Sequence, residues 1–236
     1  MQNLDHALSA ELNQRQLDHL YRKRNSHDGP QRPQLKINGQ TLLAFCSNDY
    51  LGLANHPALI RAAQNACVDY GLGSGASHLV AGHTDVHHEL EEALAKLTQR
   101  PRALLFSSGY MANMGVLSSL LDRQDAVYQD RLNHASLLDG GLLSAAKFQR
   151  YLHQDLSDLQ RQLDKTQARR HLVATDAVFS MDGDTALLKP LSQLCHAQQA
   201  WLMIDDAHGF GVLGPDVGGS AWRRGVTTRG VRCYIE

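Results

Sequence analysis

The sequence lacks closely spaced cysteines, a surplus of charge of either sign and any long apolar run. The four cysteines stand far apart, so a disulfide framework or a zinc ribbon is not expected. A formal net charge of -1 without a basic block argues against nucleic-acid and membrane-surface binding. Residues 1–25 lack the apolar core of a signal peptide, and no segment reaches membrane-spanning length. We therefore expect a cytoplasmic protein with reduced thiols.

The last part of the chain also lacks lysine, since Lys189 is the final one. Beyond it, a strand-like run at 201–204 ends in Asp205, Asp206 and His208. Pyridoxal-phosphate enzymes use such a pattern, in which a carboxylate keeps the pyridine nitrogen protonated and a histidine reaches the ring hydroxyl. Two alternatives are a turn capped by Asp206 and the start of a metal site. No matching ligand set is evident, so we expect no metal.

Apolar strand-like runs alternate with helical patterns through most of the chain. The runs occupy residues 103–106, 126–128, 148–151, 171–175 and 201–204. This alternation predicts an α/β fold with a mostly parallel sheet covered by helices. Earlier, leucines at helical spacing in residues 4–20 predict a helical arm, and Asn38-Gly39 predicts a hairpin. Helices are expected at 57–70 and from Thr84.

Three further segments offer polar groups beyond strand ends. Residues 107–110, Ser-Ser-Gly-Tyr, stand before a helical pattern, where backbone N–H groups and the helix dipole can bind a phosphate. His134 could lie flat against a planar ring, and Ser180 could offer a hydroxyl to the same crevice. The plainer alternatives are a connecting turn, a simple polar contact and a turn built on Asp182-Gly183.

Six segments together carry a resemblance to the α-oxoamine synthase family. They occur at residues 47–53, 73–75, 106–110, 130–136, 179–184 and 205–209. The resemblance implies a fold-type I PLP-transferase architecture and a homodimer. It divides the chain into a helical arm and short hairpin (1–45), a PLP-binding large domain (46–220) and a divergent tail (221–236).

The resemblance also implies residue roles around pyridoxal 5'-phosphate. The cofactor-binding residues are Gly109, Tyr110, His134, Ser180, Asp205 and His208. Gly109 and Tyr110 would bind the phosphate, and His134, Asp205 and His208 would be catalytic. His134 would also contact substrate, as would Arg22 in the basic end of the arm, for which a solvated charge run is the alternative.

The members of this family that the chain most resembles belong to the biotin pathway. They join L-alanine to a pimeloyl thioester, carried on CoA or acyl carrier protein, and release carbon dioxide. Relatives that use glycine share the machinery, so a glycine-dependent reaction is one alternative.

The chain departs from the family after Ser220. The family continues through a Gly-Thr segment to the lysine that holds the cofactor, whereas residues 221–236 contain no lysine. We interpret residues 221–236 as a divergent or out-of-frame tail, with the C-terminal small domain missing. A second functional hypothesis follows, in which the chain is a catalytically inactive fragment or the noncatalytic partner of an intact homologue.

Overall fold

The computed structural model describes residues 3–214, 219–220 and 233–235, so the predicted tail lies outside the described residues except at its end. The chain forms two compact units, Met1–Gly71 and Leu72–Glu236. Each unit is described separately below. None of the described helices is both long and apolar enough to cross a membrane.

The first unit combines two helices with a small antiparallel sheet. Its elements are α1 (Leu4–Leu17), β1 (His27–Asp28), β2 (Gln34–Ile37), β3 (Gln40–Leu43) and α2 (Pro57–Tyr70). The hairpin predicted at Asn38-Gly39 is confirmed, since it joins β2 to β3 with φ of 51° and 81°. Positive φ at both central residues is what a tight hairpin turn requires. The predicted helix at 57–70 is confirmed as α2, and His56 caps its first turn through its side chain.

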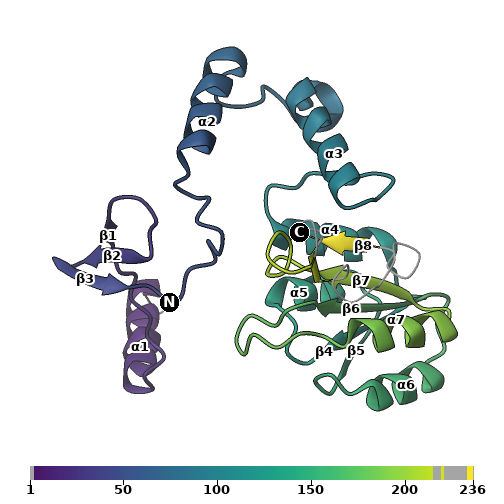
Figure 1. The fold of residues 1–236 in the computed structure, drawn as a ribbon. Helices are drawn as coiled ribbons and strands as arrows, with labels where there is room; N and C mark the ends of the chain where they lie inside the picture. Colours follow the sequence, from purple (N-terminus) through teal and green to yellow (C-terminus); the bar gives the residue numbers. More distant parts are fainter. Residues whose placement is uncertain (1–2, 215–218, 221–232, 236) are drawn as a thin grey trace. The chain divides into compact units, whose positions relative to one another are not determined.

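The second unit contains a five-stranded parallel sheet in the order β5-β4-β6-β7-β8 (Figure 1). Its strands are β4 (Ala126–Asp130), β5 (Lys147–Tyr151), β6 (His171–Asp176), β7 (Trp201–Asp205) and β8 (Cys233–Ile235). All four pairings in this sheet are parallel. The carboxyl ends of the strands therefore share one edge.

Helices cover both faces of this sheet, as predicted. The helical elements of the unit are η1 (His78–Gly82), α3 (Asp85–Leu97), α4 (Gly109–Leu120), α5 (Ala135–Leu143), α6 (Leu156–Lys165) and α7 (Leu188–Ala197). Alternate strand residues supply two cores: Tyr128 and Leu202 pack with α6 and α7, whereas Val127 and Met203 pack with α4 and α5. Figure 1 shows these two pairs of helices on opposite sides of the sheet. Period-two alternation with two apolar faces is the pattern of a doubly covered sheet.

The strand predicted at residues 103–106 is wrong, because the segment before α4 forms no strand. Leu104 is 77% exposed, and the N–H of Leu105 donates to Glu91 Oε1 (3.1 Å). A side-chain carboxylate thus takes a backbone donor that a neighbouring strand would otherwise use. The apolar run alone could not reveal this partner.

Candidate active site

Acidic residues end three strands of the parallel sheet. Asp130, Asp176 and Asp205 are the last residues of β4, β6 and β7, and Asp176 lies beside Asp205 in register. Open α/β sheets place their ligands at this edge, outside the carboxyl ends of the strands. The polar side chains that follow β4, β6 and β7 therefore converge on one region.

A pocket of about 120 Å³ occupies this edge. It is lined by Gly109, Tyr110, Asn113, His134, Ser136, Asp176, Ser180, Asp205, Ala207 and His208. All six residues expected to bind a cofactor are in this set. Arg22, the expected substrate contact, belongs to the other unit, where it is an exposed residue between α1 and β1.

Asp205 is oriented by two hydrogen bonds to its carboxylate. Asn113 Nδ2 donates to Oδ2 at 2.6 Å, and the N–H of Ala207 donates to Oδ1 at 3.1 Å. The residue is only 8% exposed, so a partner can approach it only from the pocket. A fixed, largely desolvated carboxylate is suited to hold a cationic or N–H donor group.

A chain of hydrogen bonds connects Asp205 to His134 through two residues of α4 and α5. The second Asn113 Nδ2 hydrogen is directed at Ser136 Oγ (2.9 Å), which lies 2.7 Å from His134 Nδ1. The N–H of Ser136 also donates to His134 Nδ1 (3.3 Å), so the neutral ring carries its proton on Nε2. This network fixes the plane and the tautomer of His134.

Asp176 lies between His134 and Asp205. Its Oδ2 accepts the N–H of His134 at 2.6 Å. Burial, opposed by this hydrogen bond and reinforced by the nearby carboxylates of Asp205 and Asp130, raises the pKa of Asp176 to about 7. The pocket therefore contains a carboxyl group that exchanges a proton near neutral pH.

The N-terminus of α4 forms another side of the pocket. Ser108 caps the helix by accepting the N–H of Met111 at its Oγ (3.2 Å). Gly109 and Tyr110 are the first two helical residues, whose N–H groups have no carbonyl within the helix to bind. A Cβ added at Gly109 would meet no atom within 4 Å, so the space beside its backbone is open. This terminus can bind an anion.

The hydroxyl of Tyr110 donates to Asp139 on α5, and this hydrogen bond raises the pKa of Tyr110. The Tyr110 ring meets that of His134 edge-on, with centroids 6.1 Å apart. Tyr110 thus contributes its backbone to the α4 terminus and its ring to the contact with His134.

The segment that carries Ser180 is attached to the neighbouring strand by His153. Its Nδ1 lies 2.9 Å from Asp130 Oδ1, and its Nε2 lies 2.8 Å from Asp184 Oδ2. Burial lowers the pKa of His153, but the two carboxylates outweigh burial and raise it. His153 holds the loop in place without lining the pocket.

The acidic pair at the end of β7 serves two different purposes. Asp205 faces the pocket, whereas Asp206 is fully buried and accepts the N–H of Ser220 (2.6 Å) and the hydroxyl of Tyr234. Burial raises the pKa of Asp206, against the hydrogen bonds from Ser220 and Tyr234. Asp206 is therefore a structural partner of Ser220 and Tyr234.

No role was assigned from the sequence to four of the lining residues: Asn113, Ser136, Asp176 and Ala207. Asp176 follows the run at 171–175, so its place at a strand end was a usable signal. Asn113 lies four residues after Gly109, one helical turn along the same face. Ser136 carried no signal of its own, because its contact depends on the packing of α4 against α5.

Comparison with known proteins connects this chain to one family. The family described as aminotransferase class I and II matches residues 40–230. Curated relatives named 8-amino-7-oxononanoate synthase include one from Cellvibrio japonicus, 59% identical over 95% of this chain, and one from Nitrosomonas europaea, 60% identical over 91%. The chain spans 56% of the length of each of these two relatives.

Solved structures agree on the fold. A serine palmitoyltransferase K265A variant from S. paucimobilis with a bound PLP–myriocin aldimine superposes over 98% of this chain and 59% of its own, with a TM-score of 0.89 and 28% identity. An 8-amino-7-oxononanoate synthase from Francisella tularensis covers 80% of this chain and 50% of its own, with a TM-score of 0.65 and 35% identity. The chain belongs to the aminotransferase class I and II family.

Proposed function

We propose that this chain forms the pyridoxal-phosphate-binding part of an 8-amino-7-oxononanoate synthase. The reaction is the decarboxylating condensation of L-alanine with a pimeloyl thioester, carried on CoA or acyl carrier protein. The observation that carries the proposal is the pocket in which Asp205, the α4 terminus and His134 meet. Relatives bearing the synthase name and PLP-bound structures of the same fold support it.

The chemistry of the pocket residues fits pyridoxal phosphate. The N–H groups of Gly109 and Tyr110 would hold the phosphate, and Asp205 would hold the protonated pyridine nitrogen. His134 would stack on the ring, while Ser180 and His208 would contact its hydroxyl. The bound cofactor withdraws electrons from an attached amino acid, so that Cα can lose a proton or a carboxylate.

The protein's own contribution is to orient these groups and to hold protons. Asn113 fixes the Asp205 carboxylate, and through Ser136 it fixes the His134 ring. Asp176 can hold a proton near neutral pH, at the backbone of His134. Arg22 would contact the acyl substrate in this proposal.

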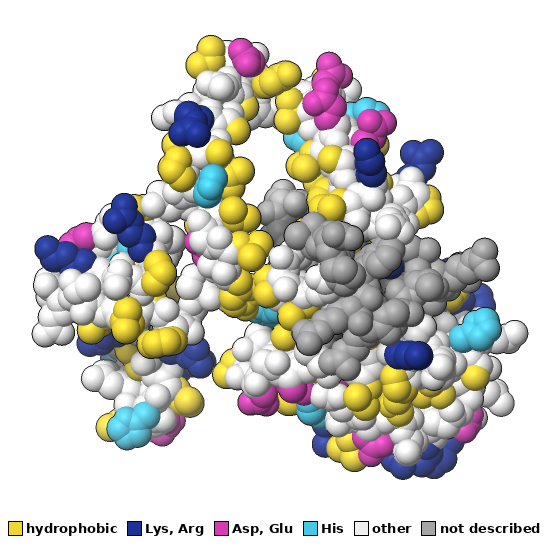
Figure 2. All heavy atoms as spheres, in the orientation of Figure 1, with side chains coloured by type: hydrophobic (Ala, Val, Ile, Leu, Met, Phe, Trp, Pro, Cys, Tyr) yellow, Lys and Arg dark blue, Asp and Glu magenta, His cyan; other side chains and the backbone are white. Residues whose placement is uncertain are grey.

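We also propose that the protein works as a homodimer. Large apolar side chains stand exposed on both units, among them Phe45, Leu72 and Leu79, and hydrophobic atoms are prominent on the surface in Figure 2. Exposed apolar side chains that gather into a patch are typical of protein interfaces. A second copy of the chain would cover part of it.

A binding measurement tests whether the pocket holds pyridoxal phosphate. The 236-residue chain would be titrated with pyridoxal phosphate, and binding followed by quenching of intrinsic fluorescence. Asp205→Ala should weaken binding at least about tenfold, because the pyridinium loses a charge-assisted hydrogen bond. Asp164→Ala is the matched control, since Asp164 is an exposed carboxylate on α6 that does not line the pocket. Equal affinities for all three proteins would contradict the site.

Bacterial growth without biotin tests the proposed synthase activity. Residues 1–220 of this chain would replace the matching residues of the Cellvibrio japonicus relative, so that the rest of that protein completes the synthase, and the hybrid gene would be expressed in a bacterium that requires biotin because its own synthase gene is deleted. Growth without biotin is expected, and an Asp205→Ala gene should not support it. A soluble, cofactor-binding product that fails to restore growth would contradict the synthase activity and favour the noncatalytic hypothesis.

A further inference from the structure

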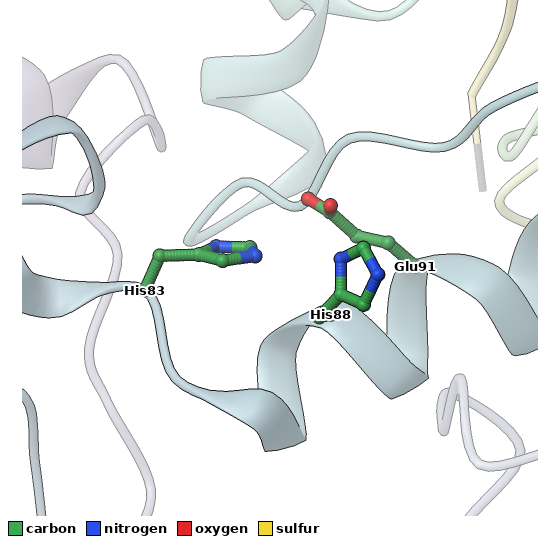
Figure 3. Close-up of side chains that lie close together, drawn as sticks. All are labelled: His83, His88 and Glu91. Atoms are coloured by element: carbon green, nitrogen blue, oxygen red, sulfur yellow. The ribbon is translucent and has the colours of Figure 1, made fainter.

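Outside the pocket, three metal-ligating side chains converge beside α3. His83 precedes the helix, and His88 and Glu91 lie on it three residues apart, which places them on one face. The candidate ligand atoms of all three residues lie within 4.8 Å of one another. Figure 3 shows both imidazole rings and the carboxylate directed at a common space.

Each of the three side chains has a second hydrogen-bonding partner. His83 Nδ1 lies 2.9 Å from His78 Nδ1, His88 Nε2 lies 3.2 Å from Glu92 Oε1, and Glu91 Oε1 accepts the Leu105 N–H. These contacts leave His83 Nε2, His88 Nδ1 and Glu91 Oε2 as ligand atoms. Ligating histidines commonly donate their other N–H to a carboxylate or another acceptor, which fixes tautomer and orientation.

Another histidine nearby has a different role. His87 Nδ1 accepts the N–H of Thr84 (3.2 Å) and lies 2.8 Å from Thr84 Oγ1, which completes the capping box of α3. Its Nδ1 therefore stabilises the start of the helix. His87 thus helps to position His88 and Glu91 rather than adding a ligand.

The chemistry of these three side chains favours zinc. Two imidazoles and one carboxylate are the ligands of zinc sites that leave a fourth position to water. Ligand atoms around one tetrahedral zinc ion, at bond lengths of about 2.0–2.2 Å, lie about 3.3–3.6 Å apart, so side chains whose ligand atoms lie up to 4.8 Å apart must move closer to bind the ion. His83 and His88 are exposed and Glu91 is half-buried, so rotation of these side chains meets little resistance.

We propose that His83, His88 and Glu91 bind one Zn²⁺ ion, with water as the fourth ligand. The site is independent of the proposed synthase activity, because none of its residues lines the pocket. It would connect the turn at η1 to α3 and, through Glu91, to the backbone of Leu105.

Calorimetric titration with zinc chloride tests the site. The chain must carry no histidine tag, because a tag binds zinc itself. We expect one site per chain, and a loss of at least about tenfold in affinity for His83→Gln, His88→Gln and Glu91→Gln. His196→Gln is the control, since His196 is an exposed helical histidine in the same unit. Its affinity should match that of the parent chain.

Cobalt provides a second readout that does not depend on affinity. Co²⁺ in a four-coordinate site absorbs strongly in the visible range, so the parent chain and His196→Gln should develop colour. The three ligand variants should remain pale while keeping the far-ultraviolet circular dichroism of the parent. Zinc affinity and cobalt colour that are unchanged in the ligand variants would overturn the proposal. A loss that is equal in His196→Gln would overturn it as well.

Discussion

Three buried aspartates near the ends of β6 and β7 have different roles because their neighbours differ. Asp205 receives hydrogen bonds at both oxygens, Asp176 receives one beside other carboxylates, and Asp206 is directed away from the pocket. Burial raises the pKa of Asp176 and of Asp206. One residue type therefore provides an oriented anion, a protonatable acid and a structural acceptor within one short stretch of sheet edge.

Asp176 should make stability depend on pH. Its pKa rises from 3.8 in the unfolded chain to about 7 in the folded one, so the folded state binds more protons between these values. The contribution of Asp176 to stability is therefore fully present below about pH 4, and falls by about 3–4 kcal/mol as pH rises to about 7. Asp176→Asn keeps the acceptor for the His134 N–H and should flatten this slope. Urea unfolding at several pH values checks it, and an unchanged slope in the variant would contradict the assignment.

Asn113 should act through Asp205 and His134. Asn113→Ala removes both amide donors and leaves the Asp205 carboxylate with only the Ala207 N–H. We expect binding of pyridoxal phosphate to weaken about tenfold, the effect of losing a charge-assisted hydrogen bond. Ser119→Ala on the outer part of α4 is the control, because Ser119 is exposed and bonds only its own helix at Gly115. A merely structural role would lower stability without changing cofactor affinity.

Gly109 tests the open space at the α4 terminus. Gly109→Ala should not destabilise the fold, since its Cβ meets no atom and alanine is the better helix residue. The same methyl group would stand where a phosphate must approach the backbone, so cofactor affinity should fall. Thermal unfolding and cofactor titration separate the two effects. Unchanged affinity would exclude the α4 terminus as the phosphate site.

At the scale of elements, the loop between β6 and α7 depends on a histidine from the β5–α6 connection. His153 joins Asp130, whose side chain is 2% exposed, to Asp184 in the turn after Ser180. Its ring also meets Phe179 edge-on, with centroids 4.6 Å apart. The position of Ser180 is thus set by ionic and aromatic contacts outside the pocket.

Replacing this histidine should loosen the loop and change the pH dependence. The pKa of His153 is raised on folding, so its contribution is fully present below the unfolded value of about 6.5 and is lost as pH rises through the folded value. His153→Ala should cost about 1–3 kcal/mol at pH 6, because Asp130 loses a partner while buried. Hydrogen exchange at Gly183, whose N–H binds Phe179 O, should accelerate. Unchanged exchange would contradict this role.

Local signals predicted most elements, whereas long-range contacts account for the misses. Asn38-Gly39 and the period of α2 are encoded within a few residues, so both were predictable. The strand predicted at residues 103–106 is wrong because Glu91, on α3, accepts the backbone N–H of Leu105. Four of the six expected pocket residues, His134, Ser180, Asp205 and His208, come together because β4, β6 and β7 end at one edge, whereas Gly109 and Tyr110 come from the start of α4. Asn113 and Ser136 could not be predicted, since their contacts require α4 to pack against α5.

At the scale of the whole molecule, many large apolar side chains are exposed. They occur on both units, and Leu79 is fully exposed. If a second copy covers part of this surface, association should be concentration-dependent. Sedimentation velocity over micromolar concentrations should reveal a dimer, and Leu79→Ser should weaken it because the change removes a fully exposed apolar side chain. A monomer at every concentration would contradict the proposed homodimer.

The central claim is that Asp205 holds the protonated ring nitrogen of pyridoxal phosphate. The most direct measurement is the ¹⁵N chemical shift of cofactor labelled at that nitrogen and bound to the protein. We predict a shift typical of a protonated pyridine in the parent chain, and a change towards the unprotonated value in Asp205→Ala at saturating cofactor. An unprotonated nitrogen in the parent, or the same shift in both proteins, would contradict the account.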